Sequence, residues 1–221
     1  MNNIFDILII GGGINGAGIA RDASGRNLRV CLVEKNKVGS ATSSWSTKLI
    51  HGGLRYLENY EFKLVRESLK EREVIKNIAE DIITPIPFII PHIPTQRSKW
   101  IIQIGLFLYD NLGGKSSLPK SKTVNINSII PNVLKKQFKI GFQYYDLQVD
   151  DKKLVELNIN DAKKKGATII ENKKVVGVSR NENYWSVKLN DNTEINSKIL
   201  INASGPWIND VLNNIIKLKS Q

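Results

Sequence analysis

The sequence has one cysteine and two histidines among its 221 residues. A single thiol rules out a disulfide framework, and this set of residues is too small for a Cys/His metal cluster, so we predict no metal site. Cys31 lies in an apolar segment, which favours a role as core filler in a protein of a reducing compartment. No apolar run approaches the ~20 residues of a transmembrane helix, and the N-terminus runs directly into a predicted strand, which argues against a secretory signal peptide.

Acidic residues are also scarce: 21 Asp and Glu stand against 32 Lys and Arg, for a net charge of +11. Such a surplus can attract nucleic acid, an anionic membrane surface or phosphate-bearing ligands, or can simply reflect a lysine-rich composition. The basic residues are dispersed and no nucleic-acid-binding motif is present, so we predict no nucleic-acid partner. The densest cluster, residues 163–165, precedes Gly166, as cations and glycine do at helix C-termini.

A glycine-rich motif near the N-terminus has the surroundings that a dinucleotide site requires. An apolar strand over residues 7–10 leads into Gly-Gly-Gly-Ile-Asn-Gly at 11–16, and a helix is predicted over 14–26. A second apolar strand then ends in Glu34. A strand, a glycine turn, a helix and an acid about 20 residues further on are typical of a βαβ dinucleotide-binding unit.

Each residue type has a physical task in such a unit. We expect Gly11 to permit the tight turn, Gly13 to let the backbone approach a pyrophosphate, and Gly16 to let helix and strand pack closely. The helix N-terminus offers N–H groups and partial positive charge to phosphates, and Glu34 can accept hydrogen bonds from a ribose hydroxyl. The less favoured alternative is a βαβ unit whose glycines serve packing alone. The chain is therefore predicted to begin with a site for an adenine dinucleotide.

The remaining sequence alternates between helix and strand patterns. The predicted elements are a helix over 60–80 with an apolar stripe through Leu64, Val65, Leu69, Val74, Ile75 and Ile78, an extended segment over 85–91, a helix over 100–112, a strand through 142–146, a helix from Asp150 or Asp151 to Lys165, and strands at 168–170, 174–178, 185–189 and 194–201.

Two of these segments leave alternatives open. The strongly apolar helix over 100–112 suits either a protein core or a membrane interface, and its length favours the core. Asp146, Asp150 and Asp151 could be taken for metal ligands, but capping and turn roles explain them more simply.

Four strings in the same order, residues 41–58, 104–110, 145–151 and 202–207, resemble the signature of the FAD-dependent, aerobic and quinone-linked glycerol-3-phosphate dehydrogenases. The resemblance covers essentially the whole chain, as the N-terminal portion of such an enzyme. It implies an α/β fold: a Rossmann-type FAD-binding domain of the glutathione-reductase or D-amino-acid-oxidase kind, with part of a β-rich substrate domain. Residues 1–80 would form the FAD-binding βαβ unit and flavin loop, 81–145 a partial substrate or cap segment, and 146–221 a return to the FAD-binding domain, truncated at its C-terminal side.

The resemblance also implies a reaction: sn-glycerol 3-phosphate is oxidised to dihydroxyacetone phosphate by hydride transfer to FAD, and the electrons pass to a quinone. The implied catalytic residues are His51, Arg55 and Tyr56. The implied cofactor-binding residues are Gly11, Gly12, Gly13, Asn15, Gly16, Glu34, Thr42, Ser43, Ser44, Lys48, Leu49, His51, Val176 and Gly205.

Arg55 suits a substrate phosphate because a guanidinium can engage two oxygens at once, and His51 can assist proton transfer or position the flavin. The implied location is the cytoplasm, peripherally at the inner face of the membrane.

Members of this family are longer than 221 residues, so we expect an incomplete N-terminal part that associates with a missing C-terminal half or with another copy of itself. Two alternatives remain. The chain could be a non-catalytic, residual dinucleotide-binding fragment. It could also be another FAD-dependent amine or hydroxy-acid oxidoreductase, which the string His-Gly-Gly-Leu-Arg at 51–55 argues against.

Overall fold

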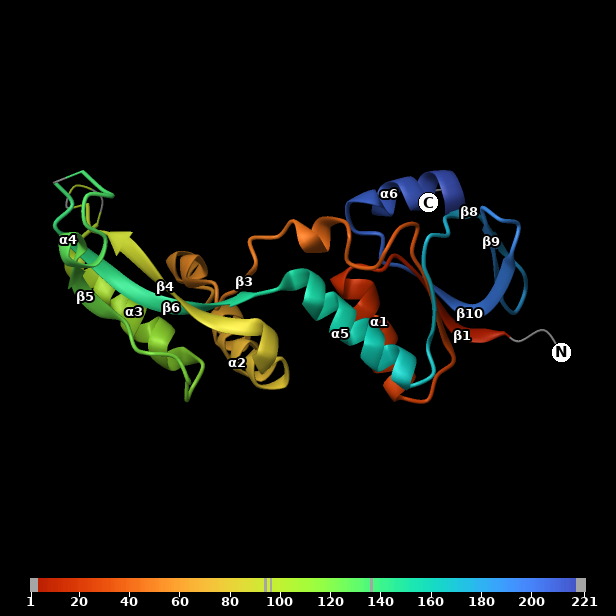
Figure 1. Cartoon of the computed structure of the whole chain (residues 1–221), viewed down its shortest axis with the longest axis horizontal. Coiled ribbons are helices and arrows are strands. Elements are labelled where there is room, and N and C mark those ends of the chain that lie inside the picture. Colours follow the sequence, from red (N-terminus) through yellow and green to blue (C-terminus); the bar gives the residue numbers. More distant parts are fainter. Residues whose placement is uncertain (1–3, 94, 96, 136, 218–221) are drawn as a thin grey trace. The chain divides into compact units, whose positions relative to one another are not determined.

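The computed structural model describes residues 4–93, 95, 97–135 and 137–217, so the end of the tail, 218–221, lies outside the described residues. The chain forms two compact units: unit 1 comprises Met1–Thr47 and Asp150–Gln221, and unit 2 comprises Lys48–Val149 (Figure 1). The division predicted from the sequence instead placed residues 48–80 with the first segment. They belong to unit 2 because their short strand joins the sheet of that unit and their long helix packs against another of its helices.

Unit 1 is built on a sheet of six strands in the order β7-β2-β1-β10-β9-β8. The strands are β1 (Phe5–Ile10), β2 (Val30–Val33), β7 (Thr168–Ile170), β8 (Val175–Arg180), β9 (Trp185–Leu189) and β10 (Glu194–Asn202). The first four in the order are mutually parallel, and β9 and β8 follow as antiparallel neighbours. The strands predicted from apolar runs are thus confirmed.

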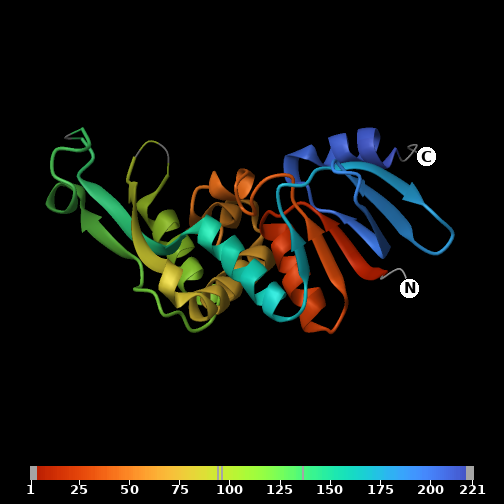
Figure 2. The ribbon, with the colours of Figure 1, turned by 45° about the vertical axis from the view of Figure 1, so that its right-hand side comes forward.

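Two helices, α1 (Ile14–Gly25) and α5 (Asp151–Lys164), lie side by side and pack on one face of this sheet (Figure 2). Small buried residues of α1, such as Ala17 and Ala20, face Val155 and Ile159 of α5 and the alternate side chains of β1 and β2. The Asp150 side chain caps α5 by accepting a hydrogen bond from the Lys153 N–H, as predicted.

The other face of the sheet carries a second apolar layer, which includes Leu8, Cys31 and Val187. Cys31 is fully buried there, in agreement with the prediction that it fills space in the core. The remaining helical segments of unit 1 are short: Thr42–Ser44, Gly205–Trp207, α6 (Ile208–Asp210) and a π-helical turn, Val211–Ile216.

Unit 2 is organised around one long strand, β6 (Ile140–Val149). Along one edge it pairs antiparallel with β4 (Ile83–Pro91), and along the other with β3 (Leu49–Ile50) and β5 (Lys122–Asn125). The proline-rich β4 has no second partner among the described residues, which is the edge position that proline tolerates. The helical segments are Leu54–Asn59, α2 (Phe62–Ile78), Glu80–Ile82, α3 (Lys99–Leu112) and α4 (Ile126–Ile129).

The interior of unit 2 departs from the stripe predicted for the helix over 60–80. Helix α2 buries Val65, Leu69 and the charged Arg72, whereas Leu64, Val74 and Ile78 are exposed. The spacing of the apolar residues predicted the helix correctly but not which of its sides is buried, because an arginine is not counted as a hydrophobic residue.

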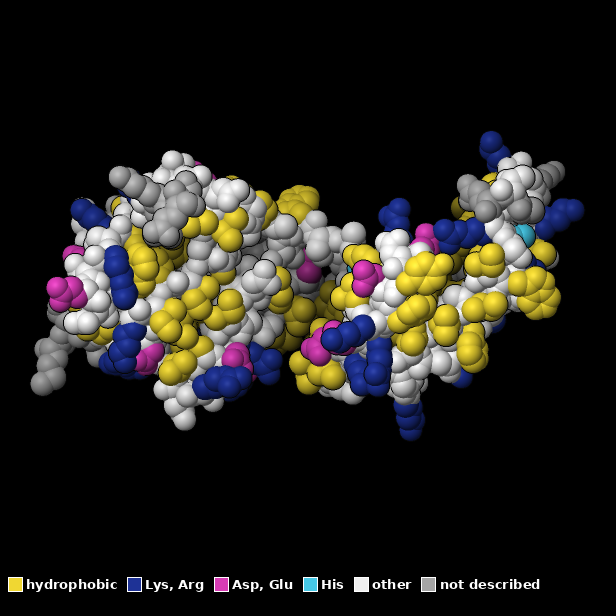
Figure 3. Space-filling model, turned by 180° about the vertical axis from the view of Figure 1, so that it is seen from behind, with side chains coloured by type: hydrophobic (Ala, Val, Ile, Leu, Met, Phe, Trp, Pro, Cys, Tyr) yellow, Lys and Arg dark blue, Asp and Glu magenta, His cyan; other side chains and the backbone are white. Residues whose placement is uncertain are grey.

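Helix α3 is likewise only partly a core helix. It buries Leu106 and Tyr109 but exposes Trp100, Ile101, Ile104 and Phe107. Hydrophobic side chains reach the surface of both units (Figure 3). Within the described ranges, no helix has the length and apolar character needed to cross a membrane.

Candidate functional site

Unit 1 contains a pocket of about 300 Å³ beyond the carboxyl ends of its central parallel strands. Ile10 ends β1, Val33 ends β2, and Ala203 follows β10, and all three line this pocket. Crevices at this edge of an open α/β sheet are the usual ligand sites of such folds.

The glycine turn lines the pocket and leaves no room for a side chain at Gly11 or Gly16. Gly11 has a φ of 110°, and a Cβ built on it would lie 2.5 Å from the carbonyl oxygen of Ala203. A Cβ on Gly16 would lie 1.9 Å from the carbonyl oxygen of Gly11, so the close packing predicted for Gly16 is present. Gly11, Gly12 and Gly13 line the pocket, whereas Gly16 supports the turn from behind it.

The N-terminus of α1 opens onto the same pocket through Gly13, Ile14 and Asn15. Ser43 comes from the polar loop after β2, and its Oγ accepts a hydrogen bond from the Ile14 N–H at 3.0 Å. Thr42 also lines the pocket, but the Ser44 hydroxyl donates to the carbonyl of Gly39. The loop therefore contributes Thr42 and Ser43 directly, while Ser44 ties the loop to itself.

Glu34 is held in the pocket wall by two backbone groups. Its carboxylate accepts hydrogen bonds from the N–H of Gly12 at 2.7 Å and from the N–H of Asn36 at 2.9 Å. An ionised carboxylate has about four acceptor positions, so Glu34 can still accept from ligand hydroxyls. The contact to Gly12 couples the acid at the end of β2 to the glycine turn.

Four lysines give the pocket wall a basic character that the sequence analysis missed: Lys35, Lys37, Lys173 and Lys174. The ammonium of Lys35 lies 4.2 Å from the ring centre of Trp207, another lining residue. Lys173 pairs with Asp191 at 2.8 Å, and this hydrogen bond holds the pKa of Asp191 well below its ordinary value. Lys35 and Lys37 follow Glu34 closely in the sequence, so the motif could have indicated them. Lys173 and Lys174 are remote in sequence and reach the pocket only because the fold brings them there.

Two further residues named from the sequence lie at or beside the pocket. Gly205 lines it and has a φ of 59°. Val176 does not line it: its neighbour Val175 does, while Val176 is 47% exposed. Successive residues of a strand point to opposite faces, which explains the difference.

The other residues named from the sequence, Lys48, Leu49, His51, Arg55 and Tyr56, belong to unit 2. Leu49 lies in β3, while His51, Arg55 and Tyr56 are exposed at and after the turn that follows it. Their roles remain predictions. Among the described residues, no three His, Cys, Asp or Glu side chains gather in a group that could hold a metal ion.

Comparison with known proteins bears on this arrangement. The chain matches the family model DAO, FAD dependent oxidoreductase, over residues 6–221. It is 46% identical to D-erythritol 1-phosphate dehydrogenase of Brucella abortus, over 95% of this chain and 43% of that protein. It is 44% identical to glycerol-3-phosphate dehydrogenase of Pseudomonas aeruginosa, over 98% of this chain and again 43% of the relative.

A solved structure agrees with these relatives. The glycerol-3-phosphate dehydrogenase of Bacillus halodurans, solved in complex with FAD, superimposes with a TM-score of 0.67 at 27% identity. The match covers 95% of this chain and 36% of that protein. The chain thus spans less than half the length of the relatives that it matches.

Proposed function

The chain belongs to the family of FAD-dependent oxidoreductases, and from this premise we propose that unit 1 binds the ADP portion of FAD and that the protein oxidises a secondary hydroxyl of a small polyol phosphate, glycerol 3-phosphate being the first candidate. The observation that carries the proposal is one pocket that combines the glycine turn, the N-terminus of α1, Glu34 and four lysines.

The residues of the pocket fit an adenine dinucleotide. Gly11 and Gly16 permit the tight turn, because a Cβ on either would collide with backbone, and the backbone of residues 11–13 lines the pocket, where a pyrophosphate can approach it. The partial positive charge at the α1 N-terminus and the lysines favour phosphate oxygens, and Glu34 favours ribose hydroxyls. In the proposed complex Gly11–Gly13, Asn15, Thr42 and Ser43 contact phosphates.

FAD supplies the acceptor for the hydride that leaves the alcohol carbon. The task of this chain's residues is then to hold the substrate and take up the hydroxyl proton. We assign phosphate binding to Arg55, whose planar guanidinium can engage two oxygens, with Tyr56 as a neutral donor. His51 is assigned to proton transfer, because an imidazole can accept a proton near neutral pH. Lys48 and Leu49 remain proposed cofactor contacts.

The substrate class rests on the names of the relatives, which specify a tetritol phosphate and glycerol 3-phosphate. Both are polyol phosphates, so a cationic phosphate anchor such as Arg55 suits either. Transfer of electrons to a quinone, contact with the inner face of an anionic membrane, and association with a C-terminal half or a second copy belong to the same proposal. The net charge of +11 favours the membrane contact.

Cofactor binding is tested by titrating residues 1–221 with FAD and, separately, with NAD. We expect quenching of flavin fluorescence that saturates, and a change in tryptophan fluorescence, to which Trp207 in the pocket lining contributes. Saturable NAD binding without FAD binding would contradict the proposal. Gly16→Ala serves as the control that removes the site.

Turnover is tested with an artificial electron acceptor. Residues 1–221 alone are expected to give no substrate-dependent reduction, because they match only 43% of the length of each of the two relatives, and small misplacements of a substrate cost about 10²-fold in rate. Fusion to the unmatched portion of the Pseudomonas aeruginosa relative is expected to give reduction with glycerol 3-phosphate. Failure of a folded, flavin-loaded fusion with both polyol phosphates would contradict the oxidation and leave the non-catalytic alternative.

The role of Arg55 is tested in the same fusion. Arg55→Lys replaces a bidentate phosphate contact with a point charge, so kcat/KM is expected to fall about ten- to a hundredfold while FAD binding stays unchanged. Arg66→Lys, at an exposed position of α2, is the matched control. A loss of FAD instead of substrate affinity would make Arg55 a cofactor residue.

A further inference from the structure

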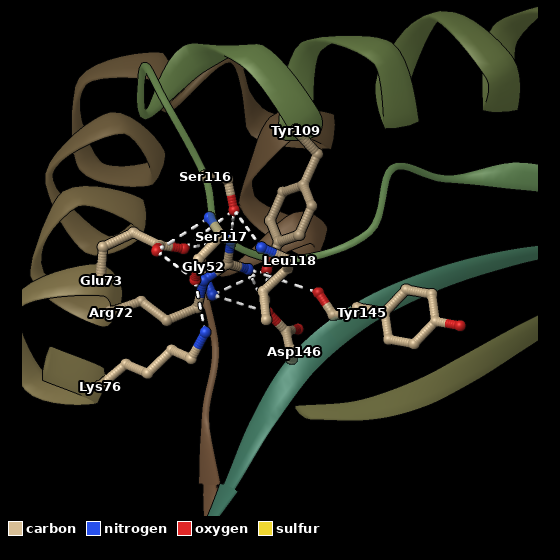
Figure 4. A network of polar contacts seen from close by, with 10 residues as sticks. All are labelled: Gly52, Arg72, Glu73, Lys76, Tyr109, Ser116, Ser117, Leu118, Tyr145 and Asp146. Atoms are coloured by element: carbon tan, nitrogen blue, oxygen red, sulfur yellow. Dashed lines mark hydrogen bonds and ion pairs between the residues drawn. The ribbon is translucent and has the colours of Figure 1, made fainter. Parts of the chain in front are cut away.

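A buried polar cluster in unit 2 joins four segments that are distant in sequence (Figure 4). One carboxylate oxygen of Asp146, in β6, accepts hydrogen bonds from Arg72 of α2 at 2.7 Å and from the Tyr109 hydroxyl of α3 at 2.7 Å. The N–H of Gly52, in the turn after β3, donates to the Tyr109 oxygen at 2.7 Å and approaches the same Asp146 oxygen at 3.4 Å. The turn is therefore tied directly to α3 and to the central strand β6, and through Asp146 to Arg72 of α2.

The cluster is almost completely removed from water. The side chains of Arg72 and Asp146 are each 5% exposed, and Tyr109 is 2% exposed. Burial, together with the neighbouring Asp146 carboxylate, raises the pKa of Tyr109, so its hydroxyl stays protonated and can act as donor and acceptor at once. Glu73 faces Arg72 from the other side at 3.6 Å and is itself held by Ser116 and Ser117.

The backbone at the tied turn lies too close to its neighbours to carry a side chain. A Cβ on Gly52 would lie 2.2 Å from a methyl group of Leu69 and 2.8 Å from the Tyr109 hydroxyl. Gly53 follows with a φ of 74°, in the left-handed region that favours glycine. His51 precedes these two glycines, and Arg55 comes shortly after them; both side chains are exposed.

We propose that Tyr109 and Asp146 are positioning residues that fix the backbone of the 51–55 turn, and so set the directions from which His51 and Arg55 act. The assignment rests on the proposed function, because it is there that His51 and Arg55 handle the substrate. Neither Tyr109 nor Asp146 touches a reacting atom in this proposal; both act through the N–H of Gly52.

Packing alone does not explain the arrangement. Apolar contacts are non-directional, and Leu69 already supplies them against Gly52. A hydrogen bond to one backbone N–H fixes both the position and the orientation of a peptide plane, at the cost of burying charges that must be fully paired. A cluster that served stability only would have no need to end on the turn that carries the two assigned side chains.

The decisive variant is Tyr109→Phe, which keeps the ring against Tyr144 and Arg72 and removes only the hydroxyl. The matched control is Tyr145→Phe in the same unit, whose hydroxyl accepts a hydrogen bond from Gln143 and makes no contact with Gly52. Hydrogen exchange of the Gly52 amide, followed by NMR in residues 1–221, is expected to accelerate at least about tenfold in Tyr109→Phe and to stay unchanged in Tyr145→Phe.

Two results would overturn the proposal at this stage. Unchanged exchange at Gly52 would show that the hydroxyl does not hold the turn. Equal acceleration throughout unit 2 would show a general loss of stability, in which the turn has no special place.

The second readout is kinetic and uses the fusion that reduces the acceptor with glycerol 3-phosphate. Tyr109→Phe is expected to lower kcat about ten- to a hundredfold with flavin content retained, because misplacement of catalytic groups acts mainly on the reacting geometry. Unchanged kcat with faster Gly52 exchange would refute the positioning role. An inactive parent fusion would refute the proposed function instead, and the exchange result would then decide whether the turn is held.

Discussion

Unit 1 directs its polar groups toward a pocket, whereas unit 2 places a charged pair in its interior. In unit 1 the two sides of the sheet are covered by apolar layers, and Glu34 and the lysines stand at the pocket wall. In unit 2 the small apolar cluster of Val65, Leu69 and Tyr109 lies against the ion pair of Arg72 and Asp146. The same chain thus uses two different means of fixing a glycine turn.

The difference follows from the secondary structure that adjoins each turn. The turn of residues 11–16 is fixed by its own sheet and helix, since a Cβ on Gly11 would meet the backbone of Ala203 after β10 and a Cβ on Gly16 would meet the carbonyl of Gly11. The turn at Gly52 follows a strand of two residues, so regular structure supplies little support there. The side chains of Tyr109 and Asp146, which accept hydrogen bonds from the Gly52 N–H, replace that support.

The largest expected effect comes from breaking the buried pair. Asp146→Ala removes the nearer of the two carboxylates that face the buried Arg72 guanidinium and is expected to lower the free energy of unfolding of unit 2 by about 3–5 kcal/mol. Asp161→Ala in unit 1 removes a partly exposed partner of Arg21 and is expected to cost less than about 1 kcal/mol. Urea unfolding of both variants measures the contrast; equal losses would contradict the distinction between the units.

The glycine turn of unit 1 is expected to respond next. Gly16→Ala places a methyl group against the carbonyl of Gly11 and is expected to cost about 1–3 kcal/mol through overpacking, with loss of FAD binding. Gly18→Ala, two residues further along α1, meets no atom within 4 Å and should stabilise by about 0.5–1 kcal/mol. Thermal unfolding and FAD titration of both variants test whether the effect of the substitution at Gly16 comes from contact with the backbone and not from helix propensity.

The smallest expected effect appears at alkaline pH. Burial raises the pKa of Cys31 from 9.0 to about 12, so the thiol ionises first in the unfolded chain. Its contribution to stability is full below pH 9 and is lost as the pH rises toward 12, by about 1.4 kcal/mol at pH 10. Denaturant unfolding at pH 8 and pH 10 should show this loss in the wild type and not in Cys31→Ala.

Tyr109 sharpens that comparison between the units. Its ordinary pKa is 10.0 and burial raises it, so the loss of the corresponding stability in unit 2 is expected to reach only about 0.4 kcal/mol at pH 10, where half of the unfolded tyrosine is ionised, and to grow above that pH. Tyr109→Phe should therefore alter the change in stability between pH 8 and pH 10 by no more than about 0.4 kcal/mol. A larger difference in that window would contradict this assignment.

The sequence by itself predicted most of the elements of both units and the core of the pocket. The turn of residues 11–16 and Glu34 could be predicted because a βαβ unit places them by local geometry: strand, turn and helix are consecutive in the chain. The cap at Asp150 and the glycine after α5 follow from equally local hydrogen bonding.

Only the tertiary structure decided which distant groups meet. Lys173 and Lys174 join the pocket because β7 pairs with β2, which brings the segment after β7 close to Glu34. In the sequence, Arg72 cannot be distinguished from the other charged residues of its helix, and Asp146 can be read as a capping or turn residue. The tertiary structure reveals their pairing, because it places α2, α3 and β6 around Gly52. Local patterns report the periodicity of exposed and buried positions, whereas the burial of a charge such as Arg72 depends on an opposite charge that is remote in sequence, here Asp146.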